Sequence, residues 1–261
     1  MPGLWFINMK LRISTMSRRL NKRKRHRREE YMLSERDKVS EGALSERTLL
    51  NLSKFVNKGI ITGIEHVIAT GKESDVFVAS AGSLDALTDR KFVAVKIFRI
   101  EASTFFSMQD YILGDPRFSS AGKTKSETVE IWCRKEYGNL VAAHDAGANV
   151  PEPYMHYKNI LAMEFLGDDE GRSWPRLKDV KLSAEEASSM EKEISEQVKL
   201  LRSAGLVHAD LSEYNILVRE GKPYLIDMAQ AVSIKHPNAE LFAERDRENM
   251  KKYFSRKTGW A

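Results

Sequence analysis

The stretch Val207–Val218, with the sequence VHADLSEYNILV, decides the fold together with the segment YLID that ends at Asp227. It holds an H-x-D triplet, then four residues, then Asn215 at the start of an apolar triplet. A short polar link around Gly221 separates this triplet from the next one, so the pattern predicts a small β-hairpin. We expect the hairpin to bring Asn215 close to Asp227, twelve positions further on.

Three side chains of this stretch have the chemistry that phosphoryl transfer needs. Asp210 can accept the proton of a hydroxyl group, and Asn215 and Asp227 can hold Mg²⁺ between them. The pattern is typical of the catalytic loop of protein kinases and of some small-molecule kinases. A polar loop in an unrelated α/β protein is the alternative, but the flanking apolar triplets and the second Asp favour the catalytic loop.

Length and composition limit the classes of protein to which the chain can belong. The chain has 261 residues, of which 42% are hydrophobic and 30% charged, which suits one large domain or two lobes. No apolar run approaches the roughly 18 residues needed to cross a bilayer, and the first residues lack the pattern of a signal peptide. Cys133 is the single cysteine, which excludes an intramolecular disulfide and fits a reducing cytoplasm. The histidines show no metal-ligand spacing with it, so no zinc site is expected.

Positive charge is concentrated at the N-terminus. Residues 1–40 carry twelve Lys/Arg against four Asp/Glu, a net +8, so the other 221 residues carry −3 of the total +5. We expect residues 1–44 to form a mobile basic arm that binds the phosphates of RNA. A solvated tail that only keeps the protein soluble is the alternative.

The next part of the chain alternates between helix and strand signals. An amphipathic helix is predicted over Ser45–Val56, and two strands around a turn at Gly71 over Ile64–Ala79. The Gly-Lys pair here does not complete a Walker A motif, which needs another glycine five residues earlier and Ser or Thr after the Lys. Lys72 and Ser74 are candidates for phosphate contacts.

A lysine lies inside the apolar strand predicted over Phe92–Phe98. Alternation places Lys96 on the same face as Ala94, whose small side chain would leave room for a flat base. A buried ammonium needs an anionic partner or a phosphate, and the VAVK sequence matches the strand lysine of kinases. An edge-strand lysine that reaches water is the alternative.

A helix predicted from Glu127 to Ala143 offers the partner of Lys96. Glu136 shares a face with apolar side chains and is the favoured candidate, with Glu127 and Glu130 as competitors. Residues 101–126, between strand and helix, are expected to form a long loop.

Two further elements complete the pattern of a nucleotide site. The apolar strand predicted over Asn159–Gly167 resembles a kinase hinge, where the carbonyl of Glu164 and the N–H of Leu166 would meet the adenine edge. Ser183 and Glu186 form a capping box that opens a helix with an apolar stripe. The stripe consists of Ala187, Met190, Ile194, Val198 and Leu201.

The 34 residues after Asp227 contain one predicted helix, Glu240–Phe254, and no long activation segment. The chain thus combines a complete set of nucleotide-site residues with the loss of the usual peptide-binding region. In this respect it resembles the RIO family of atypical serine kinases, specifically its Rio-one subgroup, over roughly residues 45–254. The matching sequences are TGKESDVF from Thr70, VAVK ending at Lys96, GDPRF from Gly114, KEY from Lys135 with the NL at Asn139, the stretch from His208 to Val218, and IDMAQAV from Ile226 with the HP at His236. Ala229 stands where the subgroup more often has glycine. The chain lacks the long extra tail of eukaryotic members, and in this it resembles archaeal members.

The resemblance implies an α+β, two-lobed kinase-like fold, with an N-lobe and hinge over residues 45–166 and a shortened helical C-lobe over 167–261. It implies ATP and Mg²⁺ (or Mn²⁺), phosphorylation of serine including the protein's own, and a role in maturation of the small ribosomal subunit through its RNA. Asp210 would be the catalytic base, and Asp227 a metal ligand and a possible site of a phospho-enzyme. The other implied nucleotide-site residues are Lys72, Ser74, Val76, Lys96, Glu136, Met163, Glu164, Leu166, Asn215 and Leu217. Autophosphorylation candidates are Ser103, Ser107, Ser119, Ser120 and Ser126.

Three alternative functions stay open. A small-molecule phosphotransferase of the aminoglycoside or choline type would need a long helical region after Asp227, which the sequence does not show. An ATPase switch on pre-ribosomal RNA, with no protein substrate, is favoured by the basic arm and the missing peptide platform. A catalytically dead RNA-binding scaffold is disfavoured because every catalytic position is intact.

Overall fold

The computed structural model describes residues 45–100 and 105–258, which form two compact units. The first unit comprises residues 45–100 together with Tyr154–Phe165, and the second comprises residues 105–153 and 166–258. Residues 105–153, which the sequence grouped with the N-lobe, therefore lie in the second unit. The expected basic arm over residues 1–44 and the candidate Ser103 lie outside the described residues.

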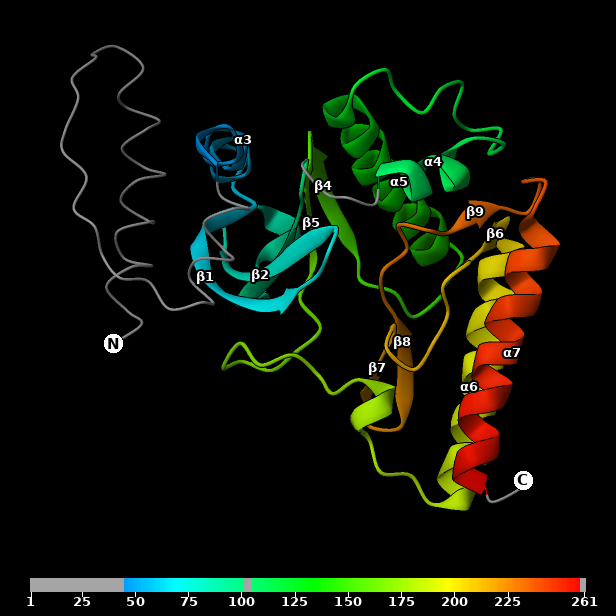
Figure 1. Ribbon diagram of the computed structural model, residues 1–261. Coiled ribbons are helices and arrows are strands. Elements are labelled where there is room, and N and C mark those ends of the chain that lie inside the picture. The colour runs from blue at the N-terminus through cyan, green and yellow to red at the C-terminus, as the bar shows by residue number, and fades with distance from the viewer. Residues whose placement is uncertain (1–44, 101–104, 259–261) are drawn as a thin grey trace, which may run out of the picture. The chain divides into compact units, whose positions relative to one another are not determined.

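The first unit is built on a five-stranded sheet with the strand order β1-β2-β3-β5-β4 (Figure 1). Neighbouring strands β1 and β2, β2 and β3, and β3 and β5 are antiparallel. The elements of this unit are α3 (Glu46–Asn57), β1 (Ile61–Thr70), β2 (Ser74–Ala81), the 3-10 helix η1 (Asp85–Leu87), β3 (Phe92–Phe98), β4 (Pro153–Tyr157) and β5 (Ile160–Glu164). The predicted helix, the two strands around Gly71 and the strands that contain Lys96 and Glu164 are confirmed.

Helix α3 packs on one face of this sheet. Ser45 caps the helix by accepting a hydrogen bond from Thr48 N, and Leu52 and Phe55 are fully buried against sheet residues. Those sheet residues are Ile61, Ile64, Phe77, Ala79, Val93, Val95, Ile97, Ile160 and Ala162. Because side chains alternate along a strand, the neighbours of these residues lie on the other face, which carries Lys96.

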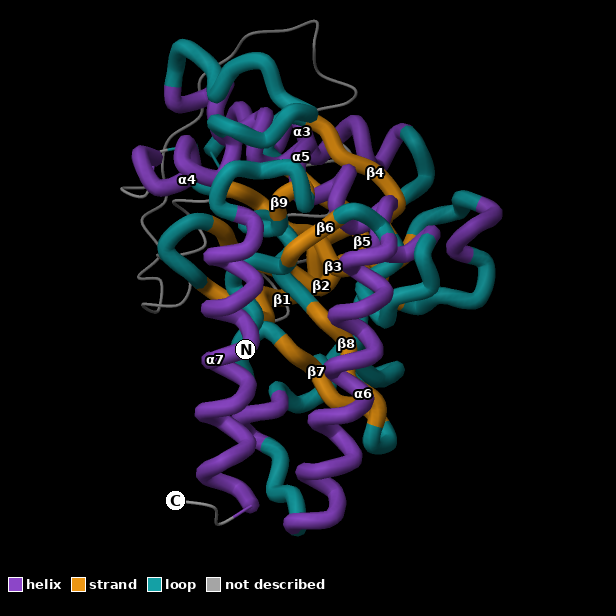
Figure 2. Tube along the Cα trace, turned by 90° about the vertical axis from the view of Figure 1, so that its right-hand side faces the viewer, coloured by secondary structure: helices purple, strands orange, loops and turns teal. Residues whose placement is uncertain are grey.

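The second unit combines long helices with two small pieces of sheet. Figures 1 and 2 both show α6 and α7 side by side, and the ends of the two helices are joined by an ion pair between Arg202 and Glu240. The elements of this unit are α4 (Phe105–Ile112), α5 (Lys125–Asp145), η2 (Leu177–Asp179), α6 (Ala184–Ser203), β6 (Leu206–Val207), β7 (Ile216–Arg219), β8 (Lys222–Leu225), β9 (Val232–Ser233) and α7 (Ala239–Thr258). Strands β6 and β9 pair with each other, as do β7 and β8.

The prediction of a loop over residues 101–126 is wrong in part, because α4 lies inside it. Met108 and Ile112 are buried, and the Tyr111 ring stacks on Phe242 with centroids 5.2 Å apart. Spacings of three and four residues are those of one helix face. Met108, Tyr111 and Ile112 were therefore the overlooked helix signal in a segment that otherwise looks polar.

The stripe predicted for α6 is correct apart from one position. Ala187, Met190, Ile194 and Leu201 are buried, whereas Val198 is 38% exposed. Gln197 is buried in its place, and its Oε1 accepts a hydrogen bond from the backbone N–H of Asn149 at 2.7 Å. A polar side chain occupies the interior here because a backbone donor needs an acceptor. The predicted capping box of Ser183 and Glu186 is present.

Candidate functional site

The central group of the second unit is the carboxylate of Asp210. The Nδ2 of Asn215 donates to the backbone oxygen of Asp210 at 2.9 Å and to its Oδ2 at 3.0 Å. The Nε2 of Gln230 donates to the same Oδ2 at 3.1 Å. Two side-chain donors therefore fix one carboxylate oxygen, Oδ2, whereas Oδ1 forms no hydrogen bond with the described residues.

The hairpin of β7 and β8 brings the backbone of Asn215 to the residue before Asp227, the other expected metal ligand. Glu220 and Gly221 both have positive φ, 51° and 77°, as a tight two-residue hairpin turn requires. The backbone N–H of Ile226 donates to the oxygen of Asn215 at 3.0 Å, which ties the residue before Asp227 to the end of the catalytic loop. The prediction that this hairpin joins the two segments is confirmed.

Asn215 and Asp227 offer the oxygen donors that Mg²⁺ prefers. The Nδ2 of Asn215 makes both hydrogen bonds to Asp210, so the side-chain oxygen is left for a cation. Asp227 is exposed and has φ 62°, a left-handed conformation that is uncommon outside glycine. The chemistry of this donor pair fits a magnesium ion.

Burial and charge act on the base itself. Burial raises the pKa of the Asp210 carboxyl above its usual value, and the negative charge of Asp227 adds to the rise. The positive charge of His208 and the hydrogen bond from Asn215 oppose it. A carboxylate with a raised pKa is a stronger proton acceptor, which suits a general base.

Asp246 on α7 holds the backbone of the catalytic loop. Its two oxygens accept hydrogen bonds from the N–H groups of Ala209 and Leu211, both at 2.8 Å, and the side chain is 6% exposed. Arg245 donates to the oxygen of Ala209, whose φ is 65°. This clamp fixes the residues on both sides of Asp210. This role could not be predicted from the sequence, because Asp246 is one of several acids in a helical segment.

Helix α5 fixes the segment after Asp227. Asn139 Nδ2 donates to the oxygens of Met228 at 2.7 Å and Ala231 at 2.8 Å. Lys135 Nζ donates to Ala229 O at 2.9 Å and also to Ala231 O. Both side chains are fully buried, and burial lowers the pKa of Lys135 to about 7. The turn that follows Asp227 is thus held through its carbonyl groups.

A second polar cluster extends from this helix to β9. Asp115 is buried and accepts hydrogen bonds from Arg117 Nε at 2.9 Å and NH2 at 2.6 Å, and from Ser233 N at 3.2 Å. Arg117 NH1 donates to Asn139 Oδ1 at 2.7 Å. Burial acts to raise the pKa of Asp115, but the hydrogen bonds and charge of Arg117 outweigh it and leave the pKa lowered.

Glu136 also lies on α5, and it is the buried member of the three candidate partners of Lys96. Its side chain is 1% exposed, whereas Glu127 is exposed and accepts a hydrogen bond from Lys123 N at 2.7 Å. Glu130 is half-buried and accepts from Ser126. A buried lysine such as Lys96 needs a partner that is buried as well. The preference for Glu136 as the partner of Lys96 therefore remains a prediction.

The first unit carries the other expected nucleotide residues. Lys96 is 4% exposed and lies opposite Val76 on β2, and Ala94 lies opposite Met163 on β5. Val76, Ala94 and Met163 belong to one apolar cluster with Phe165. The sheet therefore places the lysine beside a surface of small and apolar side chains.

The turn between β1 and β2 is narrow. Gly71 N donates to Ser74 O at 2.9 Å, and a Cβ on Gly71 would lie 3.3 Å from that oxygen. Lys72 is exposed at the tip, and Ser74 is half-buried. The next residue, Asp75, is fully buried and forms a two-point ion pair with Arg99, which fixes the base of the turn.

The expected hinge lies at the end of β5. The carboxylate of Glu164 forms an ion pair with Arg90 at 2.7 Å. Leu166 is buried and its oxygen accepts from Trp174 N at 3.0 Å, and Leu217, also buried, bridges to Arg176. Leu166 and Leu217 lie in the second unit, unlike Glu164.

Sequence reasoning missed the residues that position the site rather than perform chemistry. They are Asp246, Gln230, Lys135, Asn139, and the pairs Asp115–Arg117 and Asp75–Arg99. Apart from Asp115 and Arg117, which are two positions apart, each of these residues has a partner that is distant in sequence, so the pairing could not be read along the chain.

Comparison with known proteins agrees with this geometry. The family model of the RIO domain matches residues 75–260. The RIO-type serine/threonine-protein kinase Rio1 of Haloferax volcanii is 42% identical over 221 residues, which cover 84% of this chain and 72% of that protein. Rio1 of Thermoplasma acidophilum is 40% identical over 171 residues, 66% of this chain and 89% of that protein. The serine/threonine-protein kinase rio1 of Schizosaccharomyces pombe is 35% identical, and the chain spans half of its length.

Solved structures are similar to this chain as well. The Rio2 kinase-ADP/Mg²⁺-phosphoaspartate complex from Chaetomium thermophilum has a TM-score of 0.61 at 23% identity, over 82% of this chain and 61% of that one. Another structure, of the Rio2 kinase from the same organism, has a TM-score of 0.62 at 24% identity, over 82% of this chain and 63% of that one. These likenesses confirm the two-lobed kinase-like fold. With the family model matching most of the chain, and relatives at this identity, the chain belongs to the RIO family of kinases.

Proposed function

We propose that this protein is an ATP- and Mg²⁺-dependent serine kinase that phosphorylates itself and acts in maturation of the small ribosomal subunit. The observation that carries the proposal is the fixed carboxylate of Asp210 beside Asn215, in a chain of the RIO family. Its surroundings are intact, since the loop is held by Asp246 and the following turn by Asn139. The basic arm would bind ribosomal RNA, and the cytoplasm is the expected compartment.

Asp210 would receive the proton of the attacking serine hydroxyl. The serine oxygen then forms its bond to the γ-phosphorus of ATP while the bond to the β-phosphate oxygen breaks, and ADP leaves. When bound, Mg²⁺ (or Mn²⁺) neutralises the charge that develops on the phosphate oxygens. Asn215 and Asp227 would hold the metal through their side-chain oxygens, and Gln230 and Asn215 keep Asp210 in one orientation.

The remaining predicted residues would bind the nucleotide. Lys96 would hold the α- and β-phosphates with Glu136 as its ionic partner, and Lys72 and Ser74 would contact phosphates at the β1–β2 turn. The backbone of Glu164 and Leu166 would meet the adenine edge. Val76, Met163 and Leu217 would cover the faces of the base.

A second candidate is an ATPase switch on pre-ribosomal RNA in which the phosphoryl group passes to Asp227 and then to water. Two observations favour it. Asp227 is exposed in a left-handed conformation, and a structural neighbour at 23% identity is a Rio2 kinase complex with phosphoaspartate. In this case no protein substrate is needed.

Labelling with γ-labelled ATP and Mg²⁺ tests the proposal, with and without small-subunit particles. Wild type, Asp210→Ala, Asp227→Asn and the exposed control Asp179→Asn are compared for acid-stable label, hydroxylamine-labile label and free phosphate. The kinase proposal expects acid-stable phosphoserine in wild type and in the control. Both active-site variants should lose at least about 100-fold, the scale of a general base.

The other outcomes separate the two candidates. Free phosphate and hydroxylamine-labile label, stimulated by the particles and lost in Asp227→Asn, would establish the ATPase switch instead. No turnover in wild type with or without particles would refute both and leave a nucleotide-binding scaffold.

A further inference from the structure

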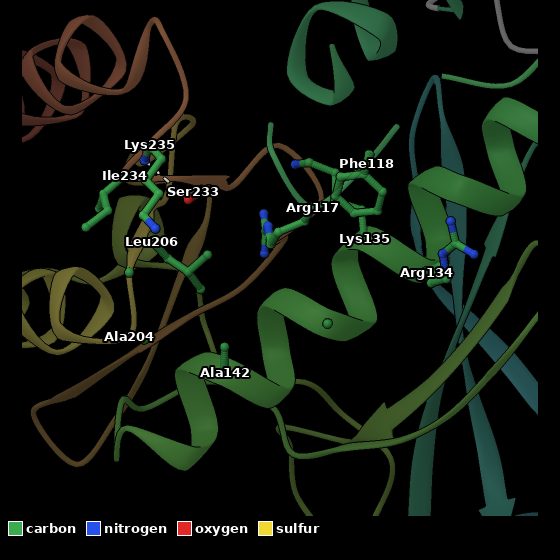
Figure 3. Close-up of a pocket in the computed structure, with 12 residues that line it drawn as sticks. Arg117, Phe118, Arg134, Lys135, Ala142, Ala204, Leu206, Ser233, Ile234 and Lys235 are labelled. Atoms are coloured by element: carbon green, nitrogen blue, oxygen red, sulfur yellow. Dashed lines mark hydrogen bonds between the residues drawn. The ribbon is translucent and has the colours of Figure 1, made fainter. Parts of the chain in front are cut away.

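A pocket of the second unit has a lining rich in cations. Its volume is about 520 Å³, and its walls come from residues 117–118, α5, the end of α6, β6 and the segment after β9 (Figure 3). The cationic lining residues are Arg117, Arg134, Lys135 and Lys235, and none of the described carboxylates lines the pocket. The lining therefore favours a negatively charged ligand.

Arg117 is held ready to bind an anion. Three of its five N–H groups are used, two by Asp115 and one by Asn139. The other two have no acceptor among the described residues. Because its partners fix the guanidinium, little side-chain entropy is lost when these two groups bind an oxyanion. Figure 3 shows Arg117 extending toward the side of the pocket where Ser233 and Lys235 lie.

The opposite wall adds a free ammonium and a hydroxyl. The side chain of Lys235 is exposed and forms no ion pair with the part of the chain that the structure describes. Ser233 Oγ accepts a hydrogen bond from the N–H of Lys235 at 3.2 Å, so its own hydrogen remains available as a donor. Arg134 lies over the Phe118 ring at 6.0 Å and forms no ion pair with a carboxylate of residues 45–100 or 105–258.

Asp115 and Lys135 do not cancel this charge. Asp115 is buried behind Arg117 and offsets that one residue, which leaves Arg134 and Lys235 uncompensated. Lys135 directs its amine to the carbonyl groups of Ala229 and Ala231, so it forms part of the wall rather than a ligand donor.

The volume requires a ligand larger than a phosphate ion. A pocket of about 520 Å³ is within the size range of organic ligands. Phe118, Ala142, Leu206 and Ile234 supply apolar walls beside the cations. Gly138 lies on the α5 wall, and a Cβ there would meet nothing within 4 Å, which marks open space. The fitting ligand has one concentrated anionic group on a small organic body.

We propose that this pocket binds the phosphate monoester of a phosphorylated serine or threonine in a peptide segment. Such a group carries about −1.5 to −2 charges on one phosphorus, which matches cations gathered in one pocket. A nucleic-acid strand carries one charge per phosphodiester and is bound by cations spread along its path. The described geometry therefore favours the phosphopeptide over RNA.

Binding of labelled peptides to the full-length protein tests this site. The probes are a short peptide with a central phosphoserine, its unphosphorylated form, and a single-stranded RNA of equal length, each measured by fluorescence anisotropy with ADP and Mg²⁺ present. We expect the phosphopeptide to bind at least tenfold more tightly than the unphosphorylated one. Millimolar inorganic phosphate should displace it, because the phosphate group is the recognised chemistry.

Two variants with different physical effects locate the binding. Lys235→Glu reverses a free surface charge, and Gly138→Leu fills the pocket without changing charge. Each should weaken phosphopeptide binding at least tenfold, while Lys192→Glu on the exposed face of α6 and the smaller Gly138→Ala should stay within about threefold of wild type. Melting curves establish that each variant is folded, and should one variant unfold, the other decides the result.

Three results would overturn the site. The first is equal affinity for phosphorylated and unphosphorylated peptide. The second is a loss in Lys192→Glu as large as in Lys235→Glu, which would indicate binding by overall charge. In the third, RNA but no phosphopeptide binds, and Lys235→Glu and Gly138→Leu abolish RNA binding, which would make the pocket a nucleic-acid site. Unchanged catalysis in Lys235→Glu would separate this site from the kinase chemistry.

Discussion

At the scale of single residues, the chemistry depends on side chains whose protonation is set by burial. Asp210 is half-buried among donors, and its pKa is raised by burial and by Asp227. Lys135 is buried against carbonyl groups, and its pKa is lowered to about 7. Burial therefore acts on both groups by disfavouring the charged form.

Replacement of Lys135 by Met should change how stability depends on pH. The lysine of the unfolded chain keeps its proton up to its ordinary pKa of 10.5, whereas in the folded chain it loses the proton near 7. Between these values the unfolded state binds more protons, so the free energy of unfolding contributed by Lys135 rises with pH, by at most about 1.4 kcal/mol per pH unit.

Urea unfolding of wild type and Lys135→Met between about pH 6 and pH 9 measures this contribution, because subtraction cancels the groups that the two proteins share. The difference should be flat below about pH 7 and should then increase in favour of wild type. A difference that stays constant over the whole range would show that Lys135 keeps its ordinary pKa in the fold.

At the scale of elements, α5 and α7 act as supports for loops that carry function. Asn139 and Lys135 on α5 hold the turn after Asp227, and Asp246 on α7 holds the loop around Asp210. Loops position reacting groups well only when their backbone donors and acceptors are fixed by rigid elements. These helices therefore contribute to the site without touching a substrate.

The variant Asp246→Asn should lower both stability and catalysis. An amide offers one acceptor oxygen and one NH₂ group, so one of the N–H groups of Ala209 and Leu211 loses its partner in a buried place. An unsatisfied buried donor costs about 1–3 kcal/mol. The phosphoryl-transfer rate should fall too, because Asp210 lies between these two residues.

Glu248→Gln is the matched control for Asp246→Asn, since it makes the same chemical change on an exposed position of α7. Denaturant midpoints and γ-phosphate transfer would be compared for the two variants. Equal small effects would show that the carboxylate of Asp246 does not hold the loop.

At the scale of the whole molecule, the two units have separate cores. The first unit carries Lys96 and the other candidate nucleotide residues of the sheet, and the second carries Asp210 and its neighbours. The first unit is stabilised by α3 against one face of the sheet, which leaves the other face to Lys96. The second is stabilised by α5, α6 and α7 around the β6–β9 and β7–β8 pairs. No helix of the described residues is long and apolar enough to cross a membrane.

Leu52→Ala tests the role of α3 in the first core. Leu52 is fully buried among the sheet side chains, so its truncation should cost about 2–5 kcal/mol of unfolding free energy. Leu50→Ala on the same helix removes a side chain that is 44% exposed and should cost less than about 1 kcal/mol. Amide hydrogen exchange of β1–β3 reports the first unit directly, and equal protection in both variants would contradict the packing of α3 on the sheet.

By itself, the sequence determined the local elements and the family to which the chain belongs. The periodicities of Ser45–Val56 and Phe92–Phe98 and the hairpin after Asn215 follow from neighbouring residues, so they could be predicted along the chain. The RIO resemblance rested on the same short-range patterns, and the comparisons confirm it.

Only the tertiary structure decided which polar residues support the site. Asp246 lies 37 positions from Ala209, and Asn139 lies 89 positions from Met228. The helix α4 differs, because its apolar face of Met108, Tyr111 and Ile112 was present in the sequence and was overlooked; the tertiary structure adds that Tyr111 packs on Trp132 and Phe242. Periodicity reports the surroundings of a residue within a few turns, whereas a buried hydrogen bond depends on a partner that folding alone brings near.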